Sequence, residues 1–264
     1  MIALICIDVD GTLVGSSGEV ADETWDAVDR MRARGMRLAI CSGRPAFGKA
    51  RDYATRLDAG GWHVFQNGAS VVHLPGGNTR SRPLAPLEVR ALIARSRDTD
   101  RPLELYSDTG YAVEMDLPRT RAHAMLLGVP WARRNLDTFA EPVVRAQWLL
   151  AHDLVDAVLA EPHEGLTLSH SLSPVMRDTS FLNVTPAGVD KGEAVRAVAR
   201  EYGVPLERVM MVGDGANDVP VLQIVGAAVA MGNAEPAARN AARHHVGDVD
   251  RGGLVEAFDL ALAL

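Results

Sequence analysis

Acidic and hydroxyl side chains occur in this sequence directly after short apolar runs. Asp8 and Asp10 follow the first such run, Ser42 follows the second, and Asp214 follows another in the C-terminal third. Clustered carboxylates repel one another, and a hard divalent cation with oxygen ligands relieves that repulsion. Mg²⁺ suits a site built from a few carboxylates, phosphate and water. These residue types therefore predict a site for Mg²⁺ and an anionic phosphoryl group.

The same residues could divide the work of phosphoryl transfer. With a metal ion lowering the negative potential, one carboxylate can act as the nucleophile and form an aspartyl phosphate. The second aspartate of the pair, two residues further on, can act as general acid and base. Ser42 and Lys191, which lies at the start of an expected helix, can donate hydrogen bonds to the phosphoryl oxygens in the transition state.

Alternating strands and helices must position these groups. Apolar runs of strand length occupy residues 2–7, 36–41, 62–66, 209–212 and 227–231. Apolar residues at helical spacing occupy residues 22–34, 46–57 and 191–202. This rhythm predicts an α/β fold with a doubly wound, Rossmann-like parallel sheet. Ligands bind beyond the carboxyl ends of strands in such sheets, so the separated motifs could converge on one site.

The middle of the chain has a different pattern. Residues 83–182 carry a mixture of expected helices and short strands, with a hairpin around residues 107–110 and no strong polar motif. We therefore expect an α+β domain inserted into the first domain. The expected boundaries are 1–82 and 183–264 for a discontinuous core, and 83–182 for the insertion.

Four segments resemble the motifs of the haloacid dehalogenase-like (HAD) superfamily of phosphohydrolases. They are Asp8-Val9-Asp10-Gly11-Thr12, Ser42 within Cys-Ser-Gly-Arg-Pro, Lys191 within Gly-Val-Asp-Lys-Gly, and Gly213-Asp214-Gly215-Ala216-Asn217-Asp218. An isolated copy of any one of them could be an ordinary turn, but all four occur in the family's order. The insertion follows Asn67-Gly68-Ala69 and resembles the α/β cap of the Cof-type subgroup, which lies between the second and third motifs and carries substrate specificity.

The resemblance implies a role for each matching residue. Asp8 would attack phosphorus and bind Mg²⁺, Asp10 would be the acid/base and offer its main-chain carbonyl to the metal, and Asp214 would be the third ligand. The phosphate would be held by Ser42, Gly43, Lys191 and Asn217, and by main-chain N–H groups of the loop that Gly11 and Thr12 shape. Asp218 would orient Lys191 or a metal-bound water.

Composition favours a cytoplasmic protein that binds neither nucleic acid nor membrane. The 264 residues carry a formal net charge of −7, whereas phosphate-rich partners need a basic surface. No apolar run reaches the length of a membrane span, and the N-terminal run makes a poor signal peptide. Only two cysteines occur, Cys6 and Cys41, which favours a reducing compartment. We expect a monomer or small homo-oligomer.

The hypothesis that accounts for all these motifs is a Mg²⁺-dependent phosphatase. Its substrate would be a small phosphorylated metabolite, such as a sugar phosphate or similar phosphomonoester, hydrolysed through an aspartyl phosphate. A phosphomutase or phosphotransferase would pass the same phosphoryl group to a hydroxyl instead of water. A non-catalytic sensor of a phosphorylated ligand would lack the nucleophile or the acid/base, whereas Asp8 and Asp10 are both present.

Overall fold

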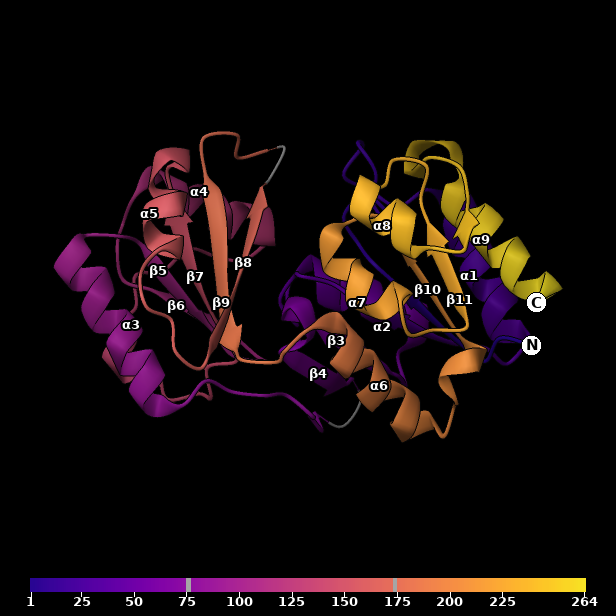
Figure 1. Cartoon of the computed structure of the whole chain (residues 1–264), viewed down its shortest axis with the longest axis horizontal. Coiled ribbons are helices and arrows are strands. Elements are labelled where there is room, and N and C mark those ends of the chain that lie inside the picture. Colours follow the sequence, from indigo (N-terminus) through magenta and orange to yellow (C-terminus); the bar gives the residue numbers. More distant parts are fainter. Residues whose placement is uncertain (75–76, 173–174) are drawn as a thin grey trace. The chain divides into compact units, whose positions relative to one another are not determined.

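The computed structural model describes residues 1–74, 77–172 and 175–264, which form two compact units (Figure 1). Unit 1 comprises Met1–Arg44, Ala50–Arg80 and Asp190–Leu264, and unit 2 comprises Pro45–Lys49 and Ser81–Val189. Each unit contains a five-stranded sheet and a hydrophobic core of its own.

A parallel sheet forms the centre of unit 1. In spatial order its strands are β12 (His244–His245), β11 (Ala227–Ala230), β10 (Val209–Gly213), β1 (Leu4–Ile7) and β2 (Arg37–Ile40). Every neighbouring pair is parallel, and Leu4 at the start of β1 lies beside Val209 on one side and Arg37 on the other. The residues that follow β10, β1 and β2 therefore lie next to one another at the carboxyl edge.

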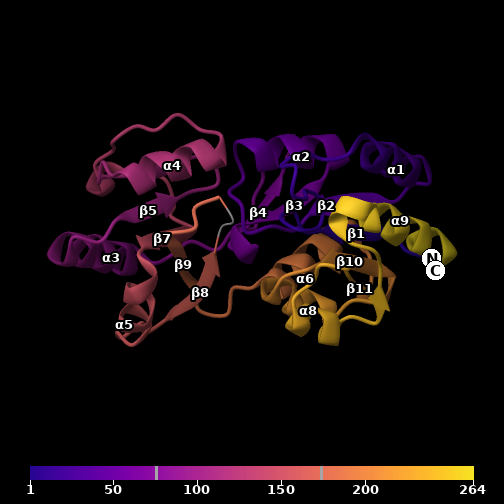
Figure 2. The same ribbon diagram turned by 90° about the horizontal axis from the view of Figure 1, so that it is seen from above.

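Helices cover both faces of this sheet (Figure 2). One face carries α1 (Asp22–Ala33) and α9 (Gly253–Ala263), and the other carries α6 (Lys191–Tyr202) and α8 (Pro236–Ala241). The unit also contains α7 (Val219–Leu222) and α2 (Lys49–Asp58), except for the first residue of α2, Lys49, which belongs to unit 2. Because apolar helix residues cover both faces, β1 and β10 are buried at every residue, which explains their unbroken apolar sequences.

A separate hairpin follows α2. β3 (Trp62–Phe65) pairs antiparallel with β4 (Ser70–His73) and is joined to the end of β2 by a single bridge between Cys41 and Val64. The sequence predicts β3 as a strand but gives no indication of β4. In the short turn between them, Gln66 and Asn67 adopt positive φ angles of 52° and 55°. Such angles are strained for residues other than glycine and often occur near functional sites.

Unit 2 is built on an antiparallel sheet. In spatial order its strands are β6 (Tyr111–Val113), β5 (Leu103–Tyr106), β7 (Arg145–Leu150), β9 (Ser180–Pro186) and β8 (Leu166–Leu172). Alternate residues point to opposite faces. One face is apolar and packs against α3 (Pro86–Thr99) and α5 (Val155–Leu159). On the other face, Ala124 of α4 (Pro118–Leu127) packs with Tyr106 and Tyr111.

The predicted fold class is confirmed: a doubly wound parallel sheet is interrupted by a second α+β unit. Residues 183–189 belong with unit 2, because β9 pairs with β7 and β8 along its length. Among the helices of the described residues, none combines the length and the apolar character that crossing a membrane requires.

Candidate active site

Three neighbouring strands of unit 1 deliver polar side chains to one edge of the sheet. Asp8 follows β1, Asp214 follows β10, and Ser42 lies just beyond β2. The hydrogen-bond ladder continues past the strand ends, since the Asp8 N–H donates to the Val212 carbonyl at 3.0 Å. The parallel sheet thus fixes these groups close together, at the edge where α/β folds bind ligands.

Lys191 joins two carboxylates in the buried part of the site. Its Nζ donates to Asp8 Oδ1 and to Asp218 Oδ1, each at 2.6 Å. The side chains of Lys191 and Asp218 are completely buried, and Asp8 is 6% exposed. Burying an isolated charge is very costly, so the ammonium and the two carboxylates depend on one another.

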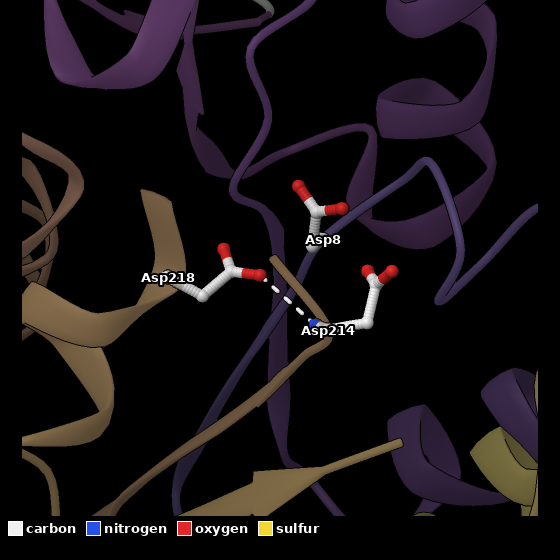
Figure 3. Close-up of side chains that lie close together, drawn as sticks. All are labelled: Asp8, Asp214 and Asp218. Carbon is white, nitrogen blue, oxygen red and sulfur yellow. Dashed lines mark hydrogen bonds between the residues drawn. The ribbon is translucent and has the colours of Figure 1, made fainter. Parts of the chain in front are cut away.

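Protein groups occupy both oxygens of Asp218. Its Oδ1 accepts from Lys191, and its Oδ2 accepts the N–H groups of Asp214 and Gly215, both at 3.0 Å (Figure 3). A Cβ atom at Gly213 would lie 2.4 Å from Asp218 Oδ2, so this approach requires glycine. The arrangement suits a carboxylate that orients Lys191 and the loop after β10.

Asp214 lies near Asp8 and is held by the loop after β1. One oxygen from each of Asp8, Asp214 and Asp218 can be chosen so that all three lie within 4.8 Å of one another. The Thr12 hydroxyl donates to Asp214 Oδ1 at 3.0 Å. Gly11 has a φ of +84°, and a Cβ atom there would lie 2.1 Å from Asp214 Oδ2. Glycine is therefore needed both for the backbone angle and for the close approach.

Two main-chain N–H groups of the loop after β1 bond within the loop. Gly11 N–H donates to the Val14 carbonyl at 2.9 Å, and Thr12 N–H to the Val9 carbonyl at 3.3 Å. These two groups close the turn itself, and Gly11 and Thr12 also fit against Asp214. That main-chain N–H groups of this loop face a phosphate stays a prediction.

Burial and mutual repulsion alter the pKa values of the cluster. Burial raises the pKa of Asp8 well above its ordinary value; Lys191 opposes this shift, whereas Asp218 and Asp214 increase it. Burial and then the charge of Asp218 raise the pKa of Asp214 to about 7. Burial would lower the pKa of Lys191, but Asp218 and Asp8 raise it above its ordinary value. The ammonium stays charged, and the carboxylates favour an additional cation.

The Asp10 carboxylate lies outside this buried cluster and pairs with Arg44. Arg44 Nε and Nη2 donate to the two Asp10 oxygens at 2.9 and 2.5 Å, and the Asp10 side chain is 66% exposed. The Arg44 N–H also donates to Ser42 Oγ at 3.1 Å, so the Ser42 hydroxyl can use its own proton to donate. One residue thus connects the expected acid/base to the expected phosphate-binding hydroxyl.

The strained turn after β3 holds the side-chain amide of Asn217, the last of the predicted site residues. Asn217 Nδ2 donates to Asn67 Oδ1 at 3.0 Å, and the Asn67 N–H donates to the Ser42 carbonyl at 3.0 Å. A Cβ atom at Gly43 would lie 3.1 Å from Asn67 Oδ1, so a side chain at position 43 would crowd this contact. Asn67 therefore positions both Asn217 and the loop containing Ser42.

The structure links the predicted residues in two groups. Asp8, Asp214, Asp218, Lys191 and Thr12 form one hydrogen-bonded cluster. Asp10, Ser42 and Asn217 belong to a second network through Arg44 and Asn67.

Sequence reasoning gave no role to Arg44, Asn67 or Asn233, whose Nδ2 donates to the Gly11 carbonyl at 2.8 Å. Each of the three closely follows a strand, β2, β3 or β11. The rule that singles out Asp8, polar residues at the carboxyl ends of strands, could have found them.

The donor set fits a hard divalent cation. The cluster contains only carboxylate oxygens, which Mg²⁺ and Ca²⁺ prefer to the nitrogen and sulfur ligands typical of zinc. Both oxygens of Asp218 already accept protein hydrogen bonds, whereas Asp8 uses only Oδ1 for Lys191. Asp214 accepts from Thr12 at Oδ1 and, at the longer distance of 3.4 Å, from Asn233 Nδ2 at Oδ2. By this criterion Asp8 has the most remaining capacity for an ion, followed by Asp214.

Comparison with known proteins agrees with this geometry. The model of the haloacid dehalogenase-like hydrolase family matches residues 5–258. YxeH of Bacillus subtilis, a protein named as a phosphatase, is 26% identical over 271 residues and is covered completely, as is this chain. The HMP-PP phosphatase of Cronobacter sakazakii is 26% identical over 246 residues, covering 89% of this chain and 86% of that protein.

A solved structure extends the likeness to the fold. The haloacid dehalogenase-like hydrolase from Bacteroides thetaiotaomicron superposes with a TM-score of 0.85 at 25% identity, covering 98% of this chain and 99% of that one. The chain belongs to the haloacid dehalogenase-like hydrolase family. The sequence-based expectations of this family and of an enzyme of the phosphatase class are thereby confirmed.

Proposed function

We propose that the protein is a Mg²⁺-dependent phosphatase that hydrolyses a small phosphorylated metabolite through an aspartyl phosphate. The observation that carries this proposal is the buried Asp8, held by Lys191 at 2.6 Å and lying beside Asp214. A carboxylate held in this way has a fixed orientation, as a nucleophile requires.

The proposed reaction makes Asp8 the nucleophile and Asp10 the general acid and base. An Asp8 oxygen attacks phosphorus, the bond from phosphorus to the ester oxygen breaks, and Asp10 protonates the departing oxygen. Asp10 then takes a proton from water, whose oxygen attacks the phosphorus of the aspartyl phosphate. Inorganic phosphate leaves and the Asp8 carboxylate is regenerated.

Other groups hold the phosphoryl oxygens during these steps. Lys191, Ser42 and Asn217 provide donors at the sheet edge, and Arg44 and Asn67 position two of them. Mg²⁺, held by Asp8, Asp214 and the Asp10 main-chain carbonyl, would neutralise charge on the phosphoryl group and the nucleophile. Asp218 keeps Lys191 in place.

We assign unit 1 as the catalytic core and unit 2 as the cap domain that sets substrate specificity. The relatives support a small substrate, since one of them is named for its action on HMP-PP. We include sugar phosphates and similar phosphomonoesters in the proposed substrate class. A phosphomutase would use the same aspartyl phosphate and is distinguished by the fate of the phosphoryl group.

We further propose a cytoplasmic protein, monomeric or a small homo-oligomer, that binds neither nucleic acid nor membranes. Cys6 and Cys41 are buried free thiols, which suits a reducing compartment. The net charge of −7 disfavours binding to polyanions.

Phosphate release tests the proposal directly. Purified protein should release inorganic phosphate from para-nitrophenyl phosphate and from a panel of metabolite phosphates with Mg²⁺, and not after EDTA treatment. Asp8→Asn should reduce kcat by at least about a thousandfold, because an amide is not a competent nucleophile. Circular dichroism should show an unchanged fold. Metal-independent turnover, or full activity of Asp8→Asn, would contradict the proposal; transfer to a second sugar without phosphate release would indicate a mutase.

A further inference from the structure

Strand β8 is a long edge strand of the unit 2 sheet. It pairs with β9 on one side, and the order of the described strands places none on its other side (Figure 1). It runs over Leu166–Leu172 with the sequence LTLSHSL. An edge strand presents a row of backbone N–H and C=O groups to which another strand can bind.

The other sheet edges of the described residues are short or covered. β12 has only two residues. Three further edges are closed by bridges to neighbouring segments: Cys41–Val64 beyond β2, Val72–Thr79 at β4 and Val113–Arg133 at β6. Proteins also protect edge strands with charged residues, proline or bulges. β8 has none of these, because its sequence contains no Asp, Glu, Lys, Arg or Pro and its register with β9 is unbroken.

The hydrogen-bond pattern shows which backbone groups of β8 point to its free side. The Ala187 N–H donates to the Gly165 carbonyl at 2.9 Å, so this pair, which continues the register of β8 and β9, is a hydrogen-bonded one. Hydrogen-bonded and non-hydrogen-bonded pairs alternate along an antiparallel ladder. Leu168 and His170 therefore direct their N–H and C=O groups away from β9. Leu166 agrees, because its N–H donates to a carbonyl of the preceding loop at 3.1 Å.

These outward groups are accessible to a partner. Among the residues that the structure describes, none is hydrogen-bonded to the main-chain N–H or C=O groups of Leu168 and His170. Ser169 and His170 are exposed, and Leu168 is partly buried against the core of unit 2. The free side of β8 thus offers alternating donors and acceptors in the pattern that an antiparallel strand needs.

We propose that β8 pairs with β8 of a second copy of this chain, antiparallel and around a twofold axis at Ser169. In this register Leu168 lies opposite the second copy's His170, and their outward N–H and C=O groups exchange two hydrogen bonds. The axis repeats the same pair on its other side. The two unit 2 sheets are joined edge to edge into one continuous sheet.

The chemistry of β8 favours its own copy as the partner. A twofold axis brings each side chain near its counterpart, so a charged strand would repel itself, whereas β8 is uncharged. Ser169 at the axis is small, and its hydroxyl both donates and accepts, so the two serines can bond to each other. Leu168 lies diagonal to the second copy's Leu168, and this contact removes more of its apolar surface from water.

Paired charge variants test this register. Ser169→Lys and Ser169→Asp each bring like charges face to face at the axis, so each variant alone should dimerise about tenfold more weakly than the wild type. An equimolar mixture of the two variants should dimerise again, because opposite charges then meet. Sedimentation equilibrium of the full chain up to about 500 µM measures all four samples. Ser169 is exposed, so the urea midpoints of dilute protein should not change.

A crosslink gives an independent measurement. Ser169→Cys should form a covalent dimer with copper phenanthroline as oxidant, because residues facing each other at a non-hydrogen-bonded position have Cα atoms about 4.5 Å apart. Ser171→Cys is the matched control, since Ser171 is exposed on the same strand. In the proposed register its two thiols are offset by about 13 Å, too far for a disulfide. The native Cys6 and Cys41 are buried, so the crosslink requires the introduced thiol.

The outcomes separate this inference from the proposed function, because dimerisation is measured without any substrate. A wild type that stays monomeric up to the highest concentration would overturn the proposal. A dimer of unchanged affinity in Ser169→Lys and Ser169→Asp would also overturn it, since the copies would then meet through another surface. Crosslinking of Ser171→Cys but not of Ser169→Cys would refute the twofold register.

Discussion

At the scale of single residues, Lys191 is the cation that balances the buried carboxylates of unit 1. Its ammonium is fully buried and touches two buried carboxylates, Asp8 and Asp218, with Asp214 close by. Three carboxylates in so small a volume would repel one another strongly without a cation. Lys191 therefore stabilises the cluster when no metal is bound as well as orienting the expected nucleophile.

This argument predicts a metal-dependent defect in Lys191→Met. In EDTA the free energy of unfolding should fall by about 3–5 kcal/mol, the usual cost of removing one partner from a buried ion pair. Mg²⁺ should restore part of the loss, because it supplies positive charge to the same carboxylates. Urea denaturation in EDTA and in Mg²⁺ measures both effects.

Arg196→Met is a suitable comparison on the same helix. Arg196 is 35% exposed and pairs with Glu193 at 3.3 Å, so its loss should cost less than about 1 kcal/mol with or without metal. Equal stability of Lys191→Met and wild type in EDTA would show that the carboxylates do not depend on the ammonium.

How well residues could be predicted depended on what surrounds them in the sequence. Asp8, Asp214 and Lys191 lie in distinctive strings at the ends or starts of recognisable elements. Arg44 and Asn67 act through contacts with residues far away in the chain, to Asp10 and Asn217. Their positions after strands could have marked them as candidates, but no local pattern reveals a hydrogen bond across 150 positions, so their partners emerge only from the fold.

At the scale of elements, His63 joins β3 to its neighbours. Its Nδ1 accepts the Ile40 N–H of β2 at 3.1 Å, and its Nε2 lies 2.9 Å from the Asp58 carbonyl at the end of α2. Because the Ile40 N–H can only donate, Nδ1 must be unprotonated and Nε2 carries the hydrogen. Protonating Nδ1 would place two donors against each other.

The pKa of His63 makes this contact sensitive to acid. Burial lowers that pKa to about 4, from an ordinary value of 6.5. Between these values the unfolded chain binds more protons than the folded chain, so the free energy of unfolding falls as the pH decreases from about 6.5 to about 4. This one residue should contribute a loss of about 3 kcal/mol.

The difference between wild type and His63→Gln isolates the contribution, because raised pKa values at Asp8 and Asp214 act in the opposite direction. We expect the variant to be less stable at neutral pH but to lose less stability on acidification. Urea midpoints across this pH range provide the measurement, with exposed His245→Gln following the wild type. Parallel curves for wild type and His63→Gln would contradict the assignment.

Elements with strong local patterns could be predicted, and those defined by tertiary contacts could not. The continuous apolar sequences of β1 and β10 predict strands, and the spacing of apolar residues in α1 and α6 predicts helices. β9 alternates apolar and polar residues because alternate side chains point to opposite faces of the sheet, and only one of these faces packs in the apolar core with α3 and α5. The spacing of Leu254, Ala257, Phe258 and Ala261 in α9 was available in the sequence, although no helix was predicted there.

At the scale of the whole molecule, each of the two units has hydrophobic core clusters of its own. One core joins the parallel sheet to α6, α7 and α8, and the other joins the antiparallel sheet to α3 and α5. The four tryptophans are divided equally, since Trp25 and Trp62 lie in unit 1 and Trp131 and Trp148 in unit 2. Fluorescence can therefore report on each unit separately.

Mg²⁺ should stabilise unit 1 more than unit 2, because the carboxylate cluster lies wholly in unit 1. At a metal concentration of about 100 times Kd, the expected gain in the free energy of unfolding is about 2.7 kcal/mol. With Trp131 and Trp148 changed to Phe, the remaining signal should move to higher urea in Mg²⁺. With Trp25 and Trp62 changed instead, the signal should move less. Asp214→Asn should abolish the Mg²⁺-induced shift of the unit 1 urea midpoint. A shift that persists in this variant would place the ion elsewhere. Equal shifts in both reporters would mean that the two units unfold together.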